Sequence, residues 1–173
     1  QTLLLNLTPS LSLLLHIDVI GSVFAVLMSA MWLVGSVFAL EYMNHDHNER
    51  SYQLFYMTVL SALIGQCYAG SMITLYVFYE LMTLLSVPLI LHNRSKEAIK
   101  GGLKYLFYSL FGAYMVLFGL FFLNRYALSL NFLPGGALDM AAVAGHEKLM
   151  LAVAFSMILG FSVKAGMFPL HAW

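Results

Sequence analysis

The sequence contains few charged residues and little cysteine. Only 8 of its 173 residues are lysine or arginine, 8 are aspartate or glutamate, and the formal net charge is zero. A chain with no excess of positive charge is not expected to bind nucleic acid or an acidic substrate. The single cysteine, Cys67, cannot form an internal disulfide and stands in an apolar run, which indicates a small core residue. Residues 1–10 contain no initiator methionine, basic segment or cleavage site, so we expect no signal peptide.

Motifs for catalysis or metal binding are also missing. The chain has no phosphate loop, nucleophile elbow or zinc-ligand spacing, so the sequence predicts neither a metal nor a cofactor. His45 and His47 are two residues apart and cannot share a helix face, so we interpret them as part of a polar loop. A haem would need two histidines at one depth, whereas His16, His92 and His171 are expected at three different depths.

Apolar residues, by contrast, are abundant. They make up 61% of the chain, which is typical of an integral membrane protein. Charged residues and helix breakers divide the sequence into apolar stretches, the first of which is about 31 Å long as a helix, enough to cross a hydrocarbon core of about 30 Å. We therefore predict an all-α, polytopic transmembrane helix bundle, a single domain over 1–173 with about five spans. The predicted spans are 20–40, 52–69, 72–91, 103–123 and 149–170.

Basic residues predict the orientation of these spans. Arg94, Lys96 and Lys100 cluster in one short connection. By the positive-inside rule, loop 92–102 is cytoplasmic, and counting spans places loop 41–51 on the same side and loop 124–147 on the other. Lys104 is expected to reach anionic lipid head groups, with a place in an internal relay of charges as the alternative.

Two charges lie within predicted spans. Glu80 would lie about 12 Å from one end of its helix and about 17 Å from the other, too deep for its carboxyl to reach either surface. Lys164 is the one charge between Leu149 and Leu170, and a lysine near the bilayer centre costs roughly 2.5–3.5 kcal/mol. We predict that the two side chains meet as an ion pair or through one water. The alternatives are a protonated Glu80 bonded to a neighbouring helix and a Lys164 that reaches an interface.

A helix break is predicted just after Lys164. Pro169 cannot donate a hydrogen bond to the carbonyl of Ala165, and Gly166 weakens the same turn. Broken helices persist in membranes where they face protein or a wet cavity. His171, beyond the break, could exchange protons with Lys164, although a plain polar contact is the simpler interpretation.

Three segments together carry a family resemblance: VFYELMTLLSVPLIL, EAIKGGLKYLFYSLFGA and FSVKAGMFPLHAW. They resemble the antiporter-like subunits shared by respiratory complex I, Mrp-type multisubunit sodium/proton antiporters and membrane-bound hydrogenases. The segment FYELMTL and the PGG loop look most similar to the D-type branch of the Mrp subunits. The resemblance covers nearly the whole chain.

The resemblance implies roles for both buried charges. Glu80 matches the glutamate of the family's fifth helix and Lys164 the lysine of its broken seventh helix, and in the family this pair controls proton occupancy. The chain would hold the third to the seventh helices, as a fragment of the N-terminal repeat. The acceptor lysine or histidine of the eighth helix and the inverted second repeat are absent, so this chain alone should not complete a path across the membrane.

We therefore expect a proton- or cation-translocating fragment of a multisubunit complex. The alternative is a structural scaffold subunit with a purely structural ion pair, and an enzyme is the third choice because this family couples to redox chemistry done elsewhere. The expected partners are the lipid bilayer, other membrane subunits, and protons, with sodium as the other candidate ion. A bacterial or archaeal inner membrane is the expected location.

Overall fold

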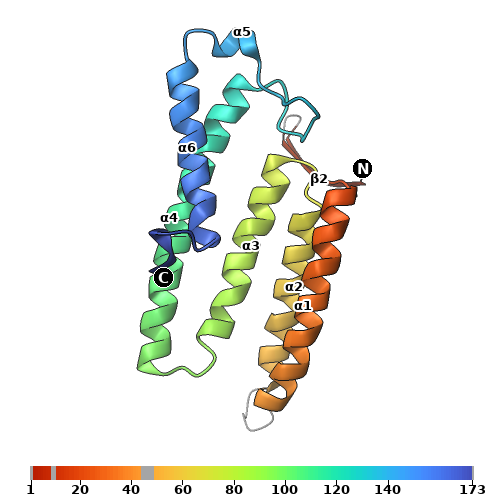
Figure 1. The fold of residues 1–173 in the computed structure, drawn as a ribbon, viewed down its shortest axis with the longest axis vertical. Helices are drawn as coiled ribbons and strands as arrows, with labels where there is room; N and C mark the ends of the chain where they lie inside the picture. The colour runs from red at the N-terminus through yellow and green to blue at the C-terminus, as the bar shows by residue number, and fades with distance from the viewer. Residues whose placement is uncertain (1, 9–10, 44–48, 173) are drawn as a thin grey trace.

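The computed structural model describes residues 2–8, 11–43 and 49–172, most of which are helical (Figure 1). In chain order the elements are β1 Thr2–Thr8, β2 Leu11–Leu15, α1 Val19–Met43, α2 Glu49–Cys67, α3 Met72–Ile90, α4 Lys96–Tyr126, α5 Met140–Val143, α6 Glu147–Lys164 and the 3-10 helix η1 Leu170–Ala172. Each predicted span overlaps one long helix. The mainly helical class is therefore confirmed.

Each long helix packs against the long helix that follows it along the chain. α1 lies against α2, α2 against α3, α3 against α4, and α4 against α6. The β1–β2 hairpin and α5 lie at one end of the bundle, and the connection between α3 and α4 lies at the other end (Figure 1). α6 stops part of the way along α4, so its last residue, Lys164, lies within the length of the bundle.

Three helices of the described ranges are long and apolar enough to cross a membrane, namely α1, α3 and α4. The other two long helices are more polar or shorter. α2 begins with Glu49 and Arg50, and α6 has 18 residues that include Lys148 and Lys164. Eighteen helical residues extend about 27 Å, slightly less than a hydrocarbon core of about 30 Å. The chain is an integral membrane protein, and crossing by α2 and α6 stays a prediction.

The start of α4 corrects the predicted loop 92–102. The helix begins at Lys96 because Ser95 caps it, with the Ser95 hydroxyl accepting a hydrogen bond from the Ala98 N–H at 3.0 Å. α4 has 31 residues, a length of about 46 Å, so its first turns can extend beyond the hydrocarbon core. Lys96 and Lys100 are exposed on these turns. Most of the predicted loop is therefore helix.

The other predicted cytoplasmic loop, 41–51, is also shorter than expected. α1 continues to Met43 and α2 begins at Glu49. The remaining connection contains His45 and His47, which lie outside the described residues. The side of the membrane that each connection faces stays a prediction.

The N-terminal hairpin is an element that the sequence analysis missed. β1 and β2 pair antiparallel, with Thr2 opposite Leu15. The Gly70 N–H donates to the Leu14 carbonyl at 2.8 Å, and the Leu14 N–H donates to the Thr74 hydroxyl at 2.8 Å. Runs of leucine show neither helical nor strand periodicity, which is why the pattern did not predict these strands. The hairpin holds the turn between α2 and α3.

Close packing between α4 and α6 depends on two glycines. A Cβ atom added to Gly112 would lie 2.8 Å from the carbonyl oxygen of Gly160, and one added to Gly160 would lie 2.5 Å from that of Gly112. Such distances are too short for any larger side chain, so the glycines let the two backbones approach. Beside them, Val116 and Val153 are fully buried between the helices. This contact fixes the end of α6 against α4.

α6 ends at Lys164 in a glycine-based cap. Gly166 has a φ of +64°, its N–H donates to the Val163 carbonyl at 3.2 Å, and the Met167 N–H donates to the Ser162 carbonyl at 3.1 Å. This pair of bonds is a Schellman motif, in which glycine supplies the left-handed residue. Lys164 is therefore the last helical residue, and Gly166 closes the turn before Pro169, whereas the sequence analysis named both residues as helix breakers. Lys164 is left on the last turn.

Candidate functional site

Lys164 joins three helices through its ammonium group. Its Nζ donates to the Thr83 hydroxyl of α3 at 2.7 Å and to the Tyr105 hydroxyl of α4 at 2.8 Å. Thr83 and Tyr105 are buried, and Lys164 is half-buried. Hydrogen bonds from a charged donor are about twice as strong as neutral ones, so two of them offset part of the cost of removing the charge from water.

The two hydroxyls continue into a short chain of hydrogen bonds. Thr83 donates to the Tyr79 carbonyl at 3.2 Å, and Ser86 donates to the Thr83 carbonyl at 2.9 Å. The Tyr105 and Ser86 hydroxyl oxygens are 2.7 Å apart. Because the Ser86 proton is already used, Tyr105 must be the donor in that pair. Each hydroxyl in this series of hydrogen bonds therefore donates its proton away from Lys164, which is the arrangement that a protonated amine requires.

Tyr79 adds an aromatic contact to the same group. The centre of its ring lies 5.6 Å from Lys164 Nζ, within the range of a cation–π interaction. Its side chain is 1% exposed, and its hydroxyl donates to the Gly160 carbonyl at 3.2 Å. Tyr79 thus links α3 to the glycine contact between α4 and α6.

Glu80 is near this site but forms no direct ion pair there. The described residues include no contact of 4.0 Å or less between its carboxylate and the Lys164 ammonium. The two charges nevertheless interact electrostatically, and Glu80 Oε1 is buried with no hydrogen-bond partner among the described residues. A direct pair is not shown among the described residues, where Lys164 donates to the hydroxyls of Thr83 and Tyr105. A link through one water stays a prediction.

Neither charge is as deeply buried as predicted. Both Glu80 and Lys164 are half-buried, and no charged side chain of the described ranges is fully buried. Lys164 is the last residue of α6, so no further helical turn covers its side chain.

The other predicted site residues lie further from this group. Lys104 is exposed on α4, next to the buried Tyr105. His171 is exposed in η1, with its ring stacked on Phe168 at 5.6 Å between centroids. Within the described part of the chain, neither side chain joins the hydrogen bonds around Lys164. Their places in a relay stay predictions.

The sequence analysis missed the hydroxyl residues of the site. A signal was present, because Tyr79, Thr83 and Ser86 are separated by four and three positions and so lie on one face of α3. Tyr105 belongs to the quoted segment EAIKGGLKYLFYSLFGA but was not assigned a role. A search for a hydroxyl-bearing helix face near an intramembrane lysine would have found these residues.

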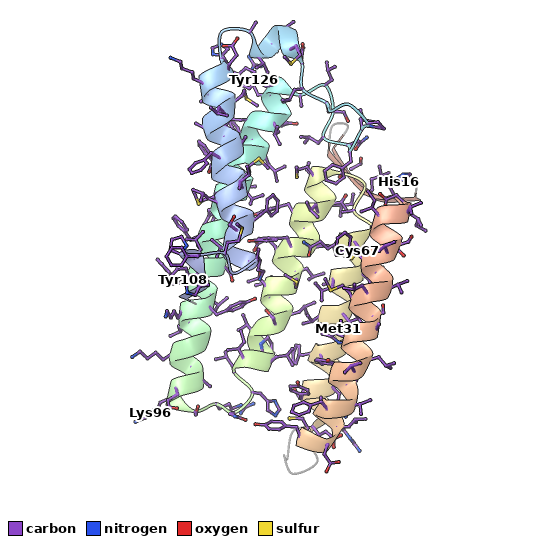
Figure 2. The ribbon with its side chains drawn as sticks, in the orientation of Figure 1. His16, Met31, Cys67, Lys96, Tyr108 and Tyr126 are labelled. Carbon is purple, nitrogen blue, oxygen red and sulfur yellow. The ribbon has the colours of Figure 1, made fainter. Side chains whose placement is uncertain are left out.

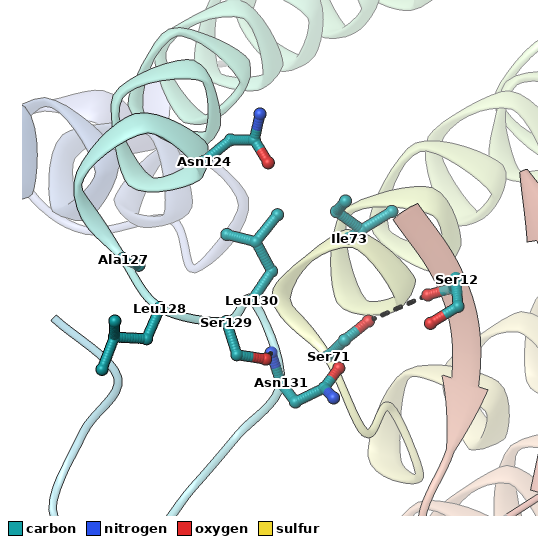
Figure 3. Close-up of a pocket in the computed structure, with 9 residues that line it drawn as sticks. All are labelled: Ser12, Ser71, Ile73, Asn124, Ala127, Leu128, Ser129, Leu130 and Asn131. Atoms are coloured by element: carbon teal, nitrogen blue, oxygen red, sulfur yellow. Dashed lines mark hydrogen bonds between the residues drawn. The ribbon is translucent and has the colours of Figure 1, made fainter. Parts of the chain in front are cut away.

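A second polar region lies at the hairpin end of the bundle (Figure 3). There, a cavity of about 310 Å³ separates the start of α3 from the segment after α4. Its polar lining consists of Ser12, Ser71, Asn124, Ser129 and Asn131. The Ser71 hydroxyl caps α3 through the Thr74 N–H at 3.2 Å, which gives this residue a structural role.

Comparison with known proteins identifies the family. Residues 69–173 match the transmembrane family described as NADH:quinone oxidoreductase/Mrp antiporter. The chain is 23% identical to the D-type subunit of the Na(+)/H(+) antiporter of Alkalihalophilus pseudofirmus, over 97% of this chain and 34% of the relative. It is 24% identical to hydrogenase-4 component B of Escherichia coli, over 93% of this chain and 24% of the relative.

A third relative comes from a respiratory complex. The NADH-quinone oxidoreductase subunit N of Desulforudis audaxviator is 27% identical over 95% of this chain and 33% of the relative. The chain thus spans about a quarter to a third of the length of these relatives. The family match includes α3, α4 and α6, the helices that hold Lys164. The chain therefore belongs to the NADH:quinone oxidoreductase/Mrp antiporter transmembrane family.

Proposed function

We propose that Lys164 is a protonatable station for proton or cation translocation in a larger membrane subunit. The observation that carries the proposal is the pair of hydrogen bonds from its Nζ to Thr83 and Tyr105, on two other helices, at the end of α6. An amine in this position can gain or lose one proton without leaving its partners. The relatives named as antiporter and quinone oxidoreductase subunits support the same assignment.

Loss of a proton from Lys164 would reorganise the hydroxyl chain. The protonated amine only donates, whereas a neutral amine has a lone pair and can accept a hydrogen bond from one hydroxyl. Tyr105 could then turn its proton from Ser86 toward Lys164. Each protonation state thus has its own set of hydrogen bonds, and the buried chain couples the proton on Lys164 to the contact between α3 and α4.

Glu80 would stabilise the protonated state through a bridging water. It is a neighbour of Thr83 on the surface of α3, three positions earlier, and its buried Oε1 has an unused acceptor. A water between the Glu80 carboxylate and the ammonium group would couple the two charges. If this bridge only holds the helices together, the chain is the scaffold subunit that was the alternative expectation.

The complete subunit would act inside a multisubunit complex of a bacterial or archaeal inner membrane. The connection before α4 and the first turns of that helix, residues 92–102, would face the cytoplasm, since Arg94, Lys96 and Lys100 cluster there. Counting spans would place residues 41–51 on the same side. His171 and Lys104 are proposed as later stations of the relay, each reached through water. Any redox chemistry would take place on other subunits.

Removing the Tyr105 hydroxyl tests the role of the hydroxyl cradle, the Thr83 and Tyr105 hydroxyls that accept from Lys164. Tyr105→Phe deletes one of two charge-assisted hydrogen bonds, each worth about 1.5–3 kcal/mol, so the protonated lysine becomes less stable. We expect ion flux by the full-length subunit, measured in sealed vesicles, to fall by about tenfold or more. Tyr108→Phe, on the same helix but outside the hydrogen bonds around Lys164, is the matched control.

Assembly of the complex is measured in the same membranes. Unchanged flux in Tyr105→Phe at normal subunit content would mean that the hydroxyl cradle plays no part in transport. Equal losses in Tyr105→Phe and Tyr108→Phe would also count against the proposal, because they would indicate a general effect of removing a phenol from α4.

A further inference from the structure

A pocket lies at the end of the bundle opposite the hairpin, beside the connection between α3 and α4. Its volume is about 310 Å³, and its apolar wall comes from Phe55 of α2 and from the end of α3, with Val87, Pro88 and Leu91. Figure 2 shows Lys96, the first residue of α4, at this same end of the molecule. Because the candidate span α3 ends at Ile90, the pocket lies at the expected boundary between hydrocarbon and lipid head groups.

The polar wall of this pocket includes Arg94, which its backbone holds against the end of α3. The Arg94 N–H donates to the Leu91 carbonyl at 3.0 Å, and Arg94 has a φ of +49°, in the left-handed region that residues other than glycine rarely adopt. Ser51 of α2 and His92 line the same pocket. The His92 ring lies edge-on to Tyr52, with 5.5 Å between the ring centroids. The connection thus brings a guanidinium group and an imidazole ring to one pocket.

The positive charge of Arg94 has no close counter-charge in the described part of the chain. No carboxylate of the described residues lies within 4.0 Å of its guanidinium group. Glu49, at the start of α2, accepts a hydrogen bond from Gln53 at 2.6 Å instead. Residues 92–102 contain three basic residues and one acidic residue, which leaves a net charge of +2 with histidine neutral. The pocket therefore favours an anion.

We propose that this pocket binds the phosphate group of an anionic phospholipid. A guanidinium group can donate two parallel hydrogen bonds to a phosphate, which gives Arg94 the role of holding the head group. Phe55, Val87 and Leu91 then contact the first methylene groups of the acyl chains. Lysines at the surface, Lys96 and Lys100, add to the attraction for an anionic lipid.

A free phosphate ion is the other source of the same chemistry. One water occupies about 30 Å³ in the liquid, so a pocket of about 310 Å³ has room for a group of many heavy atoms. A free phosphate would leave the apolar wall of Phe55, Val87 and Leu91 in contact with water, whereas a lipid covers it. The combination of a guanidinium group and an apolar wall in one pocket therefore favours the lipid.

A photoactivatable phosphatidylglycerol, with a diazirine near the glycerol end of one acyl chain, tests the proposal. The full-length subunit, in its complex, is placed in phosphatidylcholine vesicles that contain this lipid as a minor component. After irradiation, the labelled peptides are identified by mass spectrometry. We expect labels on Phe55 and on residues 87–91. We expect Arg94→Gln to reduce this labelling by about tenfold, which corresponds to about 1.4 kcal/mol.

Arg125→Gln is the matched control, because Arg125 lies on the last turn of α4, at the other end of that helix. The same charge is removed, and labelling of residues 87–91 should not change. Equal labelling in Arg94→Gln and in the unmodified protein would overturn the proposal. An equal decrease in both variants would also overturn it, because the loss would then not depend on the pocket.

Two further measurements identify the source of the phosphate. A phosphatidylcholine with the same diazirine and acyl chains has no net charge and should label residues 87–91 less strongly, whereas equal labelling by the two lipids would contradict selection of an anionic lipid. Inorganic phosphate, compared with potassium chloride at matched ionic strength, should leave the labelling unchanged. Loss of labelling with phosphate alone would assign the pocket to a free phosphate. Labelling measures lipid contact and flux measures translocation, so this proposal and the proposed function can fail separately.

Discussion

A full-length subunit carrying Lys164→Ala is expected to assemble normally and to lose nearly all ion flux. The substitution removes the amine from the hydroxyls of Thr83 and Tyr105, so no group remains there to hold a proton. Positioned acid–base groups contribute about 10²-fold to 10⁴-fold in rate, and we expect a loss of at least about 10²-fold. Flux into sealed vesicles, normalised to subunit content, is the measurement.

Lys148→Ala is the matched control for this experiment. Lys148 belongs to the same helix, α6, but is exposed near its beginning. The same charge is removed, with no expected effect on flux. Substantial flux in Lys164→Ala would show that Lys164 is dispensable for translocation and would favour the scaffold alternative.

The second large effect is expected for Glu80→Gln. This change removes a negative charge that interacts with Lys164, while the half-buried surroundings of the lysine remain. The protonated amine is then less favourable, and we expect flux to fall by about tenfold or more. Because glutamine has nearly the same size as glutamate, assembly should be preserved.

The double variant Glu80→Gln, Lys164→Ala tests whether the two residues act together. If they form one coupled unit, the second substitution adds little to the first, and the combined loss is much smaller than the product of the single losses. Flux and subunit content are measured for all four variants in parallel. Losses that multiply independently would show that Glu80 acts elsewhere, without a bridge to Lys164.

The helices could be predicted because long apolar stretches separated by charges specify them directly. The predicted first and last residues of the helices were less accurate. Ser95 starts α4 earlier than the charge pattern suggested, since a capping hydroxyl can begin a helix among polar residues. Gly166 ends α6 before Pro169 can act, because its left-handed conformation closes the last turn.

For the site, the sequence identified the charge but not its partners. Lys164 stood out because a lysine in an apolar helix is costly. Which side chains it meets depends on how α3, α4 and α6 pack, and that depends on the contact between Gly112 and Gly160. Glu80 was the obvious partner by charge, whereas the structure places the neutral hydroxyls of Thr83 and Tyr105 against the ammonium group. The charges in a sequence do not show which way each side chain points around its helix.

The most direct test of the central claim, that Lys164 gains and loses a proton during translocation, is ion flux by Lys164→Arg in sealed vesicles. Arginine preserves the positive charge and can donate to hydroxyls, but it is not deprotonated in proteins. We predict normal assembly with flux as low as in Lys164→Ala. Flux near that of the unmodified subunit would contradict the claim, because a fixed positive charge would then be sufficient.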